Sequence, residues 1–245
     1  MQLNAFCYPI IFVTGLSITA SCAHLNPAQE QSLEGRRFTM VQQQIAERGI
    51  RNKAVLKAME TVPRHLFVPE GRVSEAYADR PVPIGFGQTI SQPYIVALMT
   101  ELAEVQPDDT VLEIGTGSGY QAAILSVLAK RVFTIEYIEG LGLQARTRLA
   151  ELGYENVQVK IGDGYQGWPE HQPFDSILIT AAIDHVPQPL IDQLKTGGRI
   201  VVPLGRENEV QTLGVIVKRS DGKLDQKEII PVRFVPFLGE KGKSP

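Results

Sequence analysis

The second half of the chain alternates short apolar runs with segments of helical spacing. The apolar runs predict buried strands at residues 110–114, 131–135, 157–161, 174–180 and 199–203. Between the first three runs, residues 120–129 and 140–152 have the spacing of amphipathic helices. Such alternation predicts an α/β fold with a doubly wound, mostly parallel sheet and helices on both faces. Residues 210–218 and 227–234 predict an antiparallel pair around the Asp221-Gly222 turn, which closes the sheet at seven strands.

A helical pattern precedes the sheet. From Arg36 onward, apolar residues recur at intervals of three and four, at Phe38, Val41 and Ile45 and again at Val55, Leu56 and Met59. We expect two short helices, the first ending at Gly49 and the second capped by Asn52. Residues 81–88 contain two prolines and two glycines, so they are expected to form an irregular loop. This loop leads into a helix at about residues 93–104.

The two ends of the chain differ in composition from its body. Residues 5–23 are apolar and rich in Ser and Thr, and they end in small residues around Cys22. This pattern is typical of an export signal with Cys22 as a lipidation site, although the usual positive charges before the apolar run are absent. The alternative is a start site assigned upstream of the true one, near Met40. In either case residues 26–35 are expected to form a polar linker.

These patterns divide the chain into a leader, one domain and a tail. Its length of 245 residues fits a single large α/β domain. Residues 1–35 are the leader and linker, and residues 239–245 are a frayed tail. Within the domain, residues 36–107 are expected to form an N-terminal helical part and residues 108–238 the sheet.

Composition and charge exclude several classes of protein. With 43% hydrophobic and 21% charged residues, the chain is expected to be a soluble globule without an integral membrane domain. A net charge of −3 provides no field that would gather nucleic acid phosphates, so nucleic acid is not an expected partner. The two cysteines are Cys7 and Cys22, and the four histidines lie far apart without ligand spacing. We therefore expect no metal site.

A glycine-rich turn follows the first predicted strand of the sheet. Gly115, Gly117 and Gly119 allow the backbone to approach a ligand closely. Their Gly-x-Gly-x-Gly spacing differs from the Gly-x-Gly-x-x-Gly pattern that binds a dinucleotide pyrophosphate. Glu113, just before the turn, suits a cationic group better, such as the amino group of S-adenosylmethionine. A tight strand-to-helix connection without a ligand is the alternative interpretation of this turn.

Two more acidic residues follow the next two strands. Glu136 follows residues 131–135, where a carboxylate can accept both ribose hydroxyls of a nucleoside. Asp163, flanked by Gly162 and Gly164, lies where an adenine amino group could be recognised. Because the carboxyl ends of parallel strands meet at one edge of the sheet, these groups are expected to converge on one ligand.

Five segments of the chain together resemble one enzyme family. They are the Glu113 to Tyr120 turn, residues 85–93 (Gly-Phe-Gly-Gln-Thr-Ile-Ser-Gln-Pro), Val62-Pro63-Arg64 with Phe67-Val68-Pro69, Gly162-Asp163-Gly164, and residues 232–236. Over about residues 36–238 the chain resembles the protein-L-isoaspartate (D-aspartate) O-methyltransferases, a family of class I S-adenosylmethionine-dependent methyltransferases. The resemblance implies a Rossmann-like sheet and S-adenosyl-L-methionine as cofactor. It also implies methyl esterification of the α-carboxyl group of L-isoaspartyl residues, which initiates repair of damaged proteins and peptides.

The resemblance also assigns roles to individual residues. Ser91 matches the active-site serine, and Thr89 and Ile90 match the segment that holds the isoaspartyl residue. Val232 and Arg233 match the strand that flanks the bound peptide. The cofactor-binding positions are matched by Glu113, Gly115, Thr116, Gly117, Glu136, Asp163 and Gly164. From sequence alone, Ser91 could also act as the N-cap of the helix that begins near Pro93.

The implied reaction needs few catalytic groups. A carboxyl group with a pKa near 4 is already an anionic nucleophile at pH 7, so no general base is required. Catalysis then depends on alignment, which can contribute up to roughly 7–11 kcal/mol. Our hypothesis is that the Ser91 hydroxyl and nearby backbone N–H groups donate to the carboxylate. The N-terminal helices and residues 81–88 would exclude water.

Three other functions remain open at this point. A methyltransferase for a small molecule or RNA would share the glycine turn, but residues 87–93 argue against it. A non-catalytic module that binds unfolded chains would not need Ser91. A nicotinamide oxidoreductase is disfavoured by the glycine spacing and the absence of a proton-relay pair. We expect a monomer in the cytoplasm, where S-adenosylmethionine is made, with export or lipid anchoring through Cys22 as the alternative.

Overall fold

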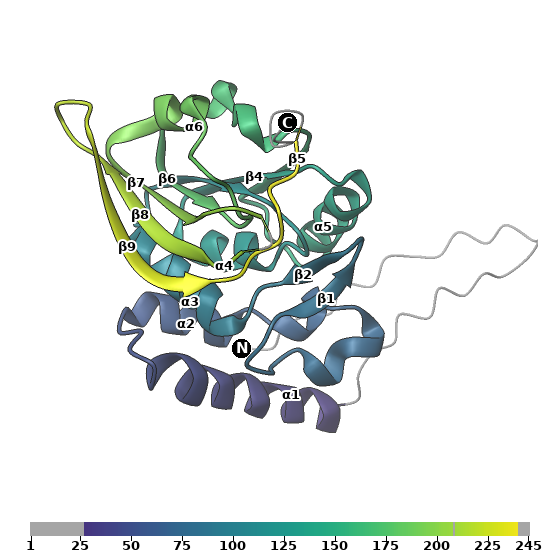
Figure 1. Cartoon of the computed structure of the whole chain (residues 1–245). Helices are drawn as coiled ribbons and strands as arrows, with labels where there is room; N and C mark the ends of the chain where they lie inside the picture. Colours follow the sequence, from purple (N-terminus) through teal and green to yellow (C-terminus); the bar gives the residue numbers. More distant parts are fainter. Residues whose placement is uncertain (1–26, 208, 240–245) are drawn as a thin grey trace, which may run out of the picture.

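The computed structural model describes residues 27–207 and 209–239, which build a seven-stranded sheet flanked by helices (Figure 1). The strands are β3 (Thr110–Ile114), β4 (Arg131–Glu136), β5 (Val157–Ile161), β6 (Phe174–Ile179), β7 (Leu194–Leu204), β8 (Gln211–Lys218) and β9 (Leu224–Val232). Their order across the sheet is β5-β4-β3-β6-β7-β8-β9. The first five pair in parallel, whereas β8 and β9 are antiparallel. The predicted doubly wound sheet and its antiparallel closing pair are confirmed.

Alternate residues of the central strands enter two separate cores. On β3, Val111 packs into a core shared with the N-terminal helices, whereas Leu112 and Ile114 pack into a second core on the opposite face. Both faces are therefore covered, which explains why these strands are continuous apolar runs rather than alternating ones.

The two faces have unequal covers. The larger cover consists of α2 (Lys53–Thr61), α3 (Pro93–Ala103), α4 (Tyr120–Leu128) and α5 (Glu139–Glu151), which contribute to the first core. The other face is covered by the short α6 (Gln188–Gln193), by the 3-10 turns η4 (Gly164–Gln166) and η5 (Pro169–His171), and by Phe237 near the end of the described chain. The chain thus carries most of its helical mass on one side of the sheet.

The prediction of a linker over residues 26–35 was wrong within the described part. Residues 27–39 form α1 (Pro27–Thr39), which continues into a π-helical segment η1 (Met40–Ala46), and α1 runs along the lower side of the molecule in Figure 1. The segment is polar because only a narrow stripe of its described side chains is buried: Leu33 on α1, then Met40, Val41 and Ile45 on η1. The predicted stop at Gly49 and the Asn52 cap are confirmed, since the Asn52 side chain accepts from two backbone N–H groups of α2.

The prediction of an irregular loop at residues 81–88 was also wrong. This region contains β1 (Val82–Gly85) and β2 (Gln88–Ile90), which pair as a small antiparallel hairpin. Val82 and Ile84 are buried while Pro83 between them is exposed, so the alternation of a strand survives the proline. Positive φ angles at the tip, including 52° at Phe86, make the tight turn.

Smaller differences lie near the carboxyl end. The structure begins β7 at Leu194, ahead of the expected residue 199, and ends β9 at Val232 rather than at residue 234. Residues 1–26 and 240–245, including Cys22 and most of the predicted tail, lie outside the described residues. In the described ranges, no helix is long and apolar enough to cross a membrane.

Candidate active site

A cavity lies at the carboxyl ends of three central strands. Its wall is formed by Glu113 and Ile114 of β3, by Ile135 and Glu136 of β4, and by Thr180 just beyond β6. Gly164 and residues 88–91 complete parts of the wall. The space between atoms, including solvent at the open mouth, is about 830 Å³.

The glycine turn gives this cavity its close-fitting floor. Gly115, Gly117 and Gly119 all have positive φ angles, of 98°, 52° and 88°. A Cβ atom at Gly115 would lie 2.4 Å from Thr180 Oγ1, which donates to the backbone oxygens of Ile114 and Gly115. Both the conformation and the close approach require glycine at position 115.

Glu113 is fully buried, and only one of its two carboxylate oxygens has a hydrogen-bond partner. Its Oε2 accepts a hydrogen bond of 2.6 Å from Thr134 Oγ1, whereas Oε1 has no hydrogen-bond partner. The Thr134 hydroxyl is also 2.6 Å from that of Thr116 in the glycine turn. Burial raises the pKa of Glu113 to about 8, with the bond from Thr134 opposing that shift. A cationic group in the cavity would supply the missing partner for Oε1.

Glu136 joins the end of β4 to the glycine turn. Its Oε2 accepts from Gly117 N at 2.7 Å, and its Oε1 accepts from Ile138 N at 2.9 Å. Burial raises the pKa of Glu136, and these backbone donors partly offset the effect. Each carboxylate oxygen can still accept a second hydrogen bond, so ligand hydroxyls can be bound at Glu136 without breaking the turn.

Asp163 and Gly164 are placed differently from each other. Gly164 lines the cavity, and a Cβ atom there would lie 2.4 Å from a side-chain carbon of Ile114. Asp163 is not among the lining residues; it is the N-cap of η4, and its Oδ1 accepts from Tyr165 N at 2.9 Å. The backbone after β5 therefore reaches the site at Gly164, with Asp163 shaping the turn beside it.

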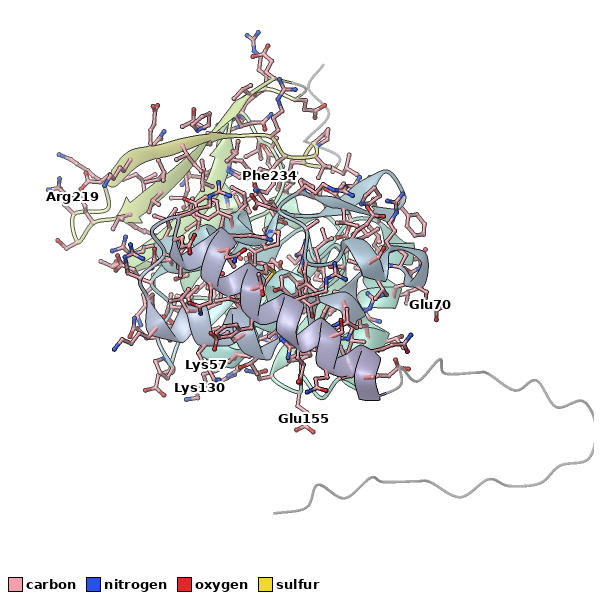
Figure 2. The ribbon with its side chains drawn as sticks, turned by 90° about the horizontal axis from the view of Figure 1, so that it is seen from below. Lys57, Glu70, Lys130, Glu155, Arg219 and Phe234 are labelled. Atoms are coloured by element: carbon pink, nitrogen blue, oxygen red, sulfur yellow. The ribbon has the colours of Figure 1, made fainter. Side chains whose placement is uncertain are left out.

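A second cavity adjoins the first one. It is lined by Thr89, Ser91, Val232 and Arg233, among others, whereas Ile90 lines only the first cavity. Figure 2 shows Arg219 at the far tip of the β8–β9 ribbon and Phe234, another lining residue, beyond its opposite end. Sequence-predicted substrate residues from two distant segments thus lie around one space.

The two cavities have four lining residues in common. These residues are Thr89, Ser91, Thr180 and Val235. Ser91 is not the N-cap of α3: that position is occupied by Gln92, which makes no side-chain capping bond. The half-buried Ser91 side chain is therefore not engaged as a cap, and it lies where the two cavities meet.

The sequence analysis missed several residues of this site. Thr134 and Thr180 were assigned to strands but given no role, although Thr180 follows β6 at the same sheet edge as Glu136. That position at a strand end was the available signal. Residues 235–238 also line the first cavity and were given no role, although residues 235 and 236 belong to a segment that carries the family resemblance.

The described part of the chain contains no group of three or more His, Cys, Asp or Glu side chains that could hold a metal ion.

Comparisons with known proteins point to one enzyme family. The family model of protein-L-isoaspartate(D-aspartate) O-methyltransferase (PCMT) matches residues 36–242. Protein-L-isoaspartate O-methyltransferase 2 of Polaromonas sp. (strain JS666) is 58% identical over 190 residues, 78% of this chain and 90% of the relative. The enzyme of Opitutus terrae is 53% identical over 87% of this chain and 91% of its own.

Solved structures agree with the sequence comparisons. A structure named protein-L-isoaspartate O-methyltransferase aligns with a TM-score of 0.76 at 30% identity, covering 84% of this chain and 66% of that chain, slightly less than two thirds. A Plasmodium falciparum structure carrying the same enzyme name, in complex with S-adenosyl-L-homocysteine, aligns with a TM-score of 0.70 at 25% identity, covering 82% of this chain and 98% of its own. The chain belongs to the protein-L-isoaspartate(D-aspartate) O-methyltransferase family, the S-adenosylmethionine-dependent enzymes that methylate isoaspartyl residues in damaged proteins.

Proposed function

We propose that the first cavity binds S-adenosyl-L-methionine, that the second binds an isoaspartyl peptide, and that Ser91 aligns the acceptor where they meet. The chain is a methyltransferase that esterifies the α-carboxyl group of L-isoaspartyl residues, the step that initiates their repair. This assignment of one cavity to the cofactor and the other to the peptide is supported by the lining residues that both cavities share, which include Ser91.

The first cavity fits the cofactor in its polar groups. Glu113 Oε1, buried and without a hydrogen-bond partner, suits the cofactor's ammonium group. Glu136 would accept the ribose hydroxyls, and the backbone at Gly115, Thr116 and Gly117 would pass close beneath the ligand. The related Plasmodium structure holds S-adenosyl-L-homocysteine, the product of such a cofactor.

The adenine end of the cofactor is assigned to the turn after β5. We propose that Gly164 provides room and that Asp163, at the N-cap of η4, recognises the adenine amino group. This role requires the Asp163 side chain to serve the ligand in addition to its bond with Tyr165 N.

Transfer needs alignment more than acid or base. S-adenosylmethionine supplies the methyl group: the new O–CH₃ bond forms as the S–CH₃ bond breaks, and the electron pair of that bond remains on sulfur. The isoaspartyl carboxylate is already ionised near pH 7 and loses no proton. The Ser91 hydroxyl donates a hydrogen bond to one carboxylate oxygen, which orients the other oxygen toward the methyl group.

The substrate peptide lies between two segments that are far apart in sequence. Thr89, which lines both cavities, and Ile90, which lines the first, hold the isoaspartyl residue where the cavities meet. Val232 and Arg233 of the second cavity flank the rest of the peptide from the end of β9. Arg233 is exposed, so its charge is available to carboxylates of the peptide.

Three further properties belong to the same proposal. The chain works as a monomer, in the cytoplasm, and without a nucleic acid partner. The net charge of −3 supports the last of these. Light scattering coupled to size-exclusion chromatography would test the first, and fractionation of cells that express the complete chain would test the second.

The function is tested with labelled S-adenosylmethionine and two matched peptides, one with L-isoaspartate and one with L-aspartate at the same position. We expect base-labile label on the isoaspartyl peptide only. A Ser91→Ala variant should lower kcat and leave cofactor binding intact. Full activity of that variant would overturn the role of Ser91, whereas label on neither peptide would overturn the substrate assignment.

A further inference from the structure

Arg64 is the largest fully buried side chain of the described chain, and it has no acidic partner. Its exposed fraction is 0%, and the charged and polar groups that influence its pKa are two tyrosines, not carboxylates. Burial lowers the pKa of Arg64 to about 10, so the guanidinium remains charged near neutral pH. Burying a cation without a counter-ion lowers the stability of the fold. A function of Arg64 that would offset this loss is therefore expected in its hydrogen bonds.

The guanidinium holds backbone carbonyls from two separate segments. Its Nε donates to Ala76 O, and its Nη2 donates to Ser91 O, each at 2.7 Å. Its Cζ lies 4.8 Å from the ring centroid of Tyr120, the residue that follows the glycine turn. Nη1 is buried without a hydrogen-bond partner. Arg64 therefore connects the segment carrying Ser91 to the start of α4.

Regular secondary structure does not hold the Ser91 carbonyl. β2 ends at Ile90, and the first carbonyl used by α3 is that of Gln92, which accepts from Ile95 N and Val96 N. Within residues 27–207 and 209–239, no backbone N–H donates to Ser91 O. The bond from Arg64 therefore restrains this carbonyl, which belongs to the residue that carries the Ser91 hydroxyl.

We propose that Arg64 is a positioning residue for methyl transfer: it holds the Ser91 carbonyl so that the Ser91 hydroxyl faces the junction of the two cavities. This inference rests on the role of Ser91 proposed above. A displacement of about 1 Å at a catalytic group can lower the rate roughly 100-fold. Loss of the bond that holds the Ser91 carbonyl should therefore lower kcat measurably. The planar guanidinium bonds two carbonyls in fixed geometry, which an ammonium group does not reproduce.

The test compares Arg64→Lys and Arg64→Met with the wild-type chain. Both variants should lower kcat for an isoaspartyl peptide, by about 10- to 100-fold for Arg64→Met and by less for Arg64→Lys. The KM for S-adenosylmethionine and the Kd for S-adenosylhomocysteine should stay within about twofold. Should Arg64→Met not fold, the comparison rests on Arg64→Lys, which keeps the charge and can donate to one of the two carbonyls but not to both in the same geometry.

A matched control separates positioning from loss of stability. His65 is the next residue of the same 3-10 helix, is 2% exposed, and bonds Tyr77 Oη at 2.8 Å rather than Ser91. His65→Gln should lower the melting temperature and leave kcat unchanged. An equal fall in kcat in His65→Gln and Arg64→Lys at equal loss of stability would overturn the inference.

A double-variant cycle shows whether Arg64 acts through Ser91. In a Ser91→Ala background, Arg64→Lys should cause almost no further loss of kcat, because the hydroxyl that Arg64 positions is gone. Independent, multiplying losses would overturn the Arg64 assignment and leave the role of Ser91 intact. A fully active Ser91→Ala variant would overturn the proposed role of Ser91 and the role of Arg64 with it.

Discussion

The ring of Phe86 lies directly against Gly140. A Cβ atom at Gly140 would come within 2.5 Å of Phe86 Cζ, although Gly140 belongs to helix α5 and Phe86 to the tip of the β1–β2 hairpin. Gln88 on the hairpin and Tyr137 ahead of α5 both line the first cavity. The contact therefore joins the hairpin to the helix beside the first cavity.

Filling this contact should weaken cofactor binding. Gly140→Ala would push the Phe86 ring, which is 55% exposed, away from α5 and loosen its hold on the hairpin, so we expect the Kd for S-adenosylhomocysteine, measured by calorimetry, to rise by about tenfold at most, equivalent to roughly 1.4 kcal/mol. Leu143→Ala, a partly exposed position of the same helix, is the control and should bind normally. If Gly140→Ala weakened binding further in a Phe86→Ala background, displacement of the Phe86 ring would not be the cause of the weaker binding.

The buried Glu113 should make the stability of the cofactor-free enzyme depend on pH. Its pKa is about 8 in the folded chain and near 4.5 in an unfolded one, so the folded state binds more protons between these values. The free energy of unfolding should fall as pH rises from about 5 to 8, by on the order of a few kcal/mol at most, and then level off.

Urea denaturation across this pH range would measure the effect. Glu113→Gln should flatten the dependence, because the amide does not titrate. A saturating concentration of S-adenosylmethionine should also reduce the slope in the wild-type chain by providing a cation for Glu113. Parallel curves for wild type and Glu113→Gln would contradict the role of this carboxyl group.

Adding a single methyl group at Gly115 should lower the stability of the protein. Gly115→Ala combines a strained φ of 98° with a contact on Thr180 Oγ1, so it should lower the free energy of unfolding by about 2 kcal/mol or more. In a Thr180→Ala background the same change should cost less, because the contacting oxygen is removed. Equal costs in both backgrounds would assign the whole effect to the backbone.

Arg233 should affect the peptide and not the cofactor. It lines the second cavity alone, so Arg233→Ala is expected to raise the KM for an isoaspartyl peptide about tenfold, roughly 1.4 kcal/mol, with the KM for S-adenosylmethionine unchanged. Arg219→Ala, at the opposite tip of the β8–β9 ribbon, is the matched control (Figure 2). Unchanged peptide kinetics in Arg233→Ala would remove this residue from the site.

The sheet could be predicted from the sequence because its strands are buried on both sides. Leu112 and Val111 face different cores, so the strand is an uninterrupted apolar run that is easily recognised. Helix α1 was missed because its buried stripe is narrow: of its described side chains, only that of Leu33, 6% exposed, is an apolar one in the core. The β1–β2 hairpin was missed because Pro83 obscures an alternation that burial reveals.

Site residues could be predicted from the sequence where their chemical type indicates a role. They could not be predicted where the role depends on a contact made only in the folded chain. Glu113 and Glu136 are acidic residues at strand ends, a pattern visible in the sequence. The contribution of Thr180 depends on its approach to Gly115, and that of Arg64 on a bond to a backbone carbonyl 27 residues away. Such contacts leave no periodic or local pattern, so only the three-dimensional structure shows them.

Strand β9 is an edge strand of the sheet. The backbone N–H and C=O groups on its outer side could pair with a strand of another chain. Residues 224–228 are exposed and include Asp225, Lys227 and Glu228, and Pro231 interrupts the row of donors near its end. Charges and a proline at an edge disfavour the addition of a further strand. The strand that completes the sheet thus also protects the protein against edge-to-edge aggregation.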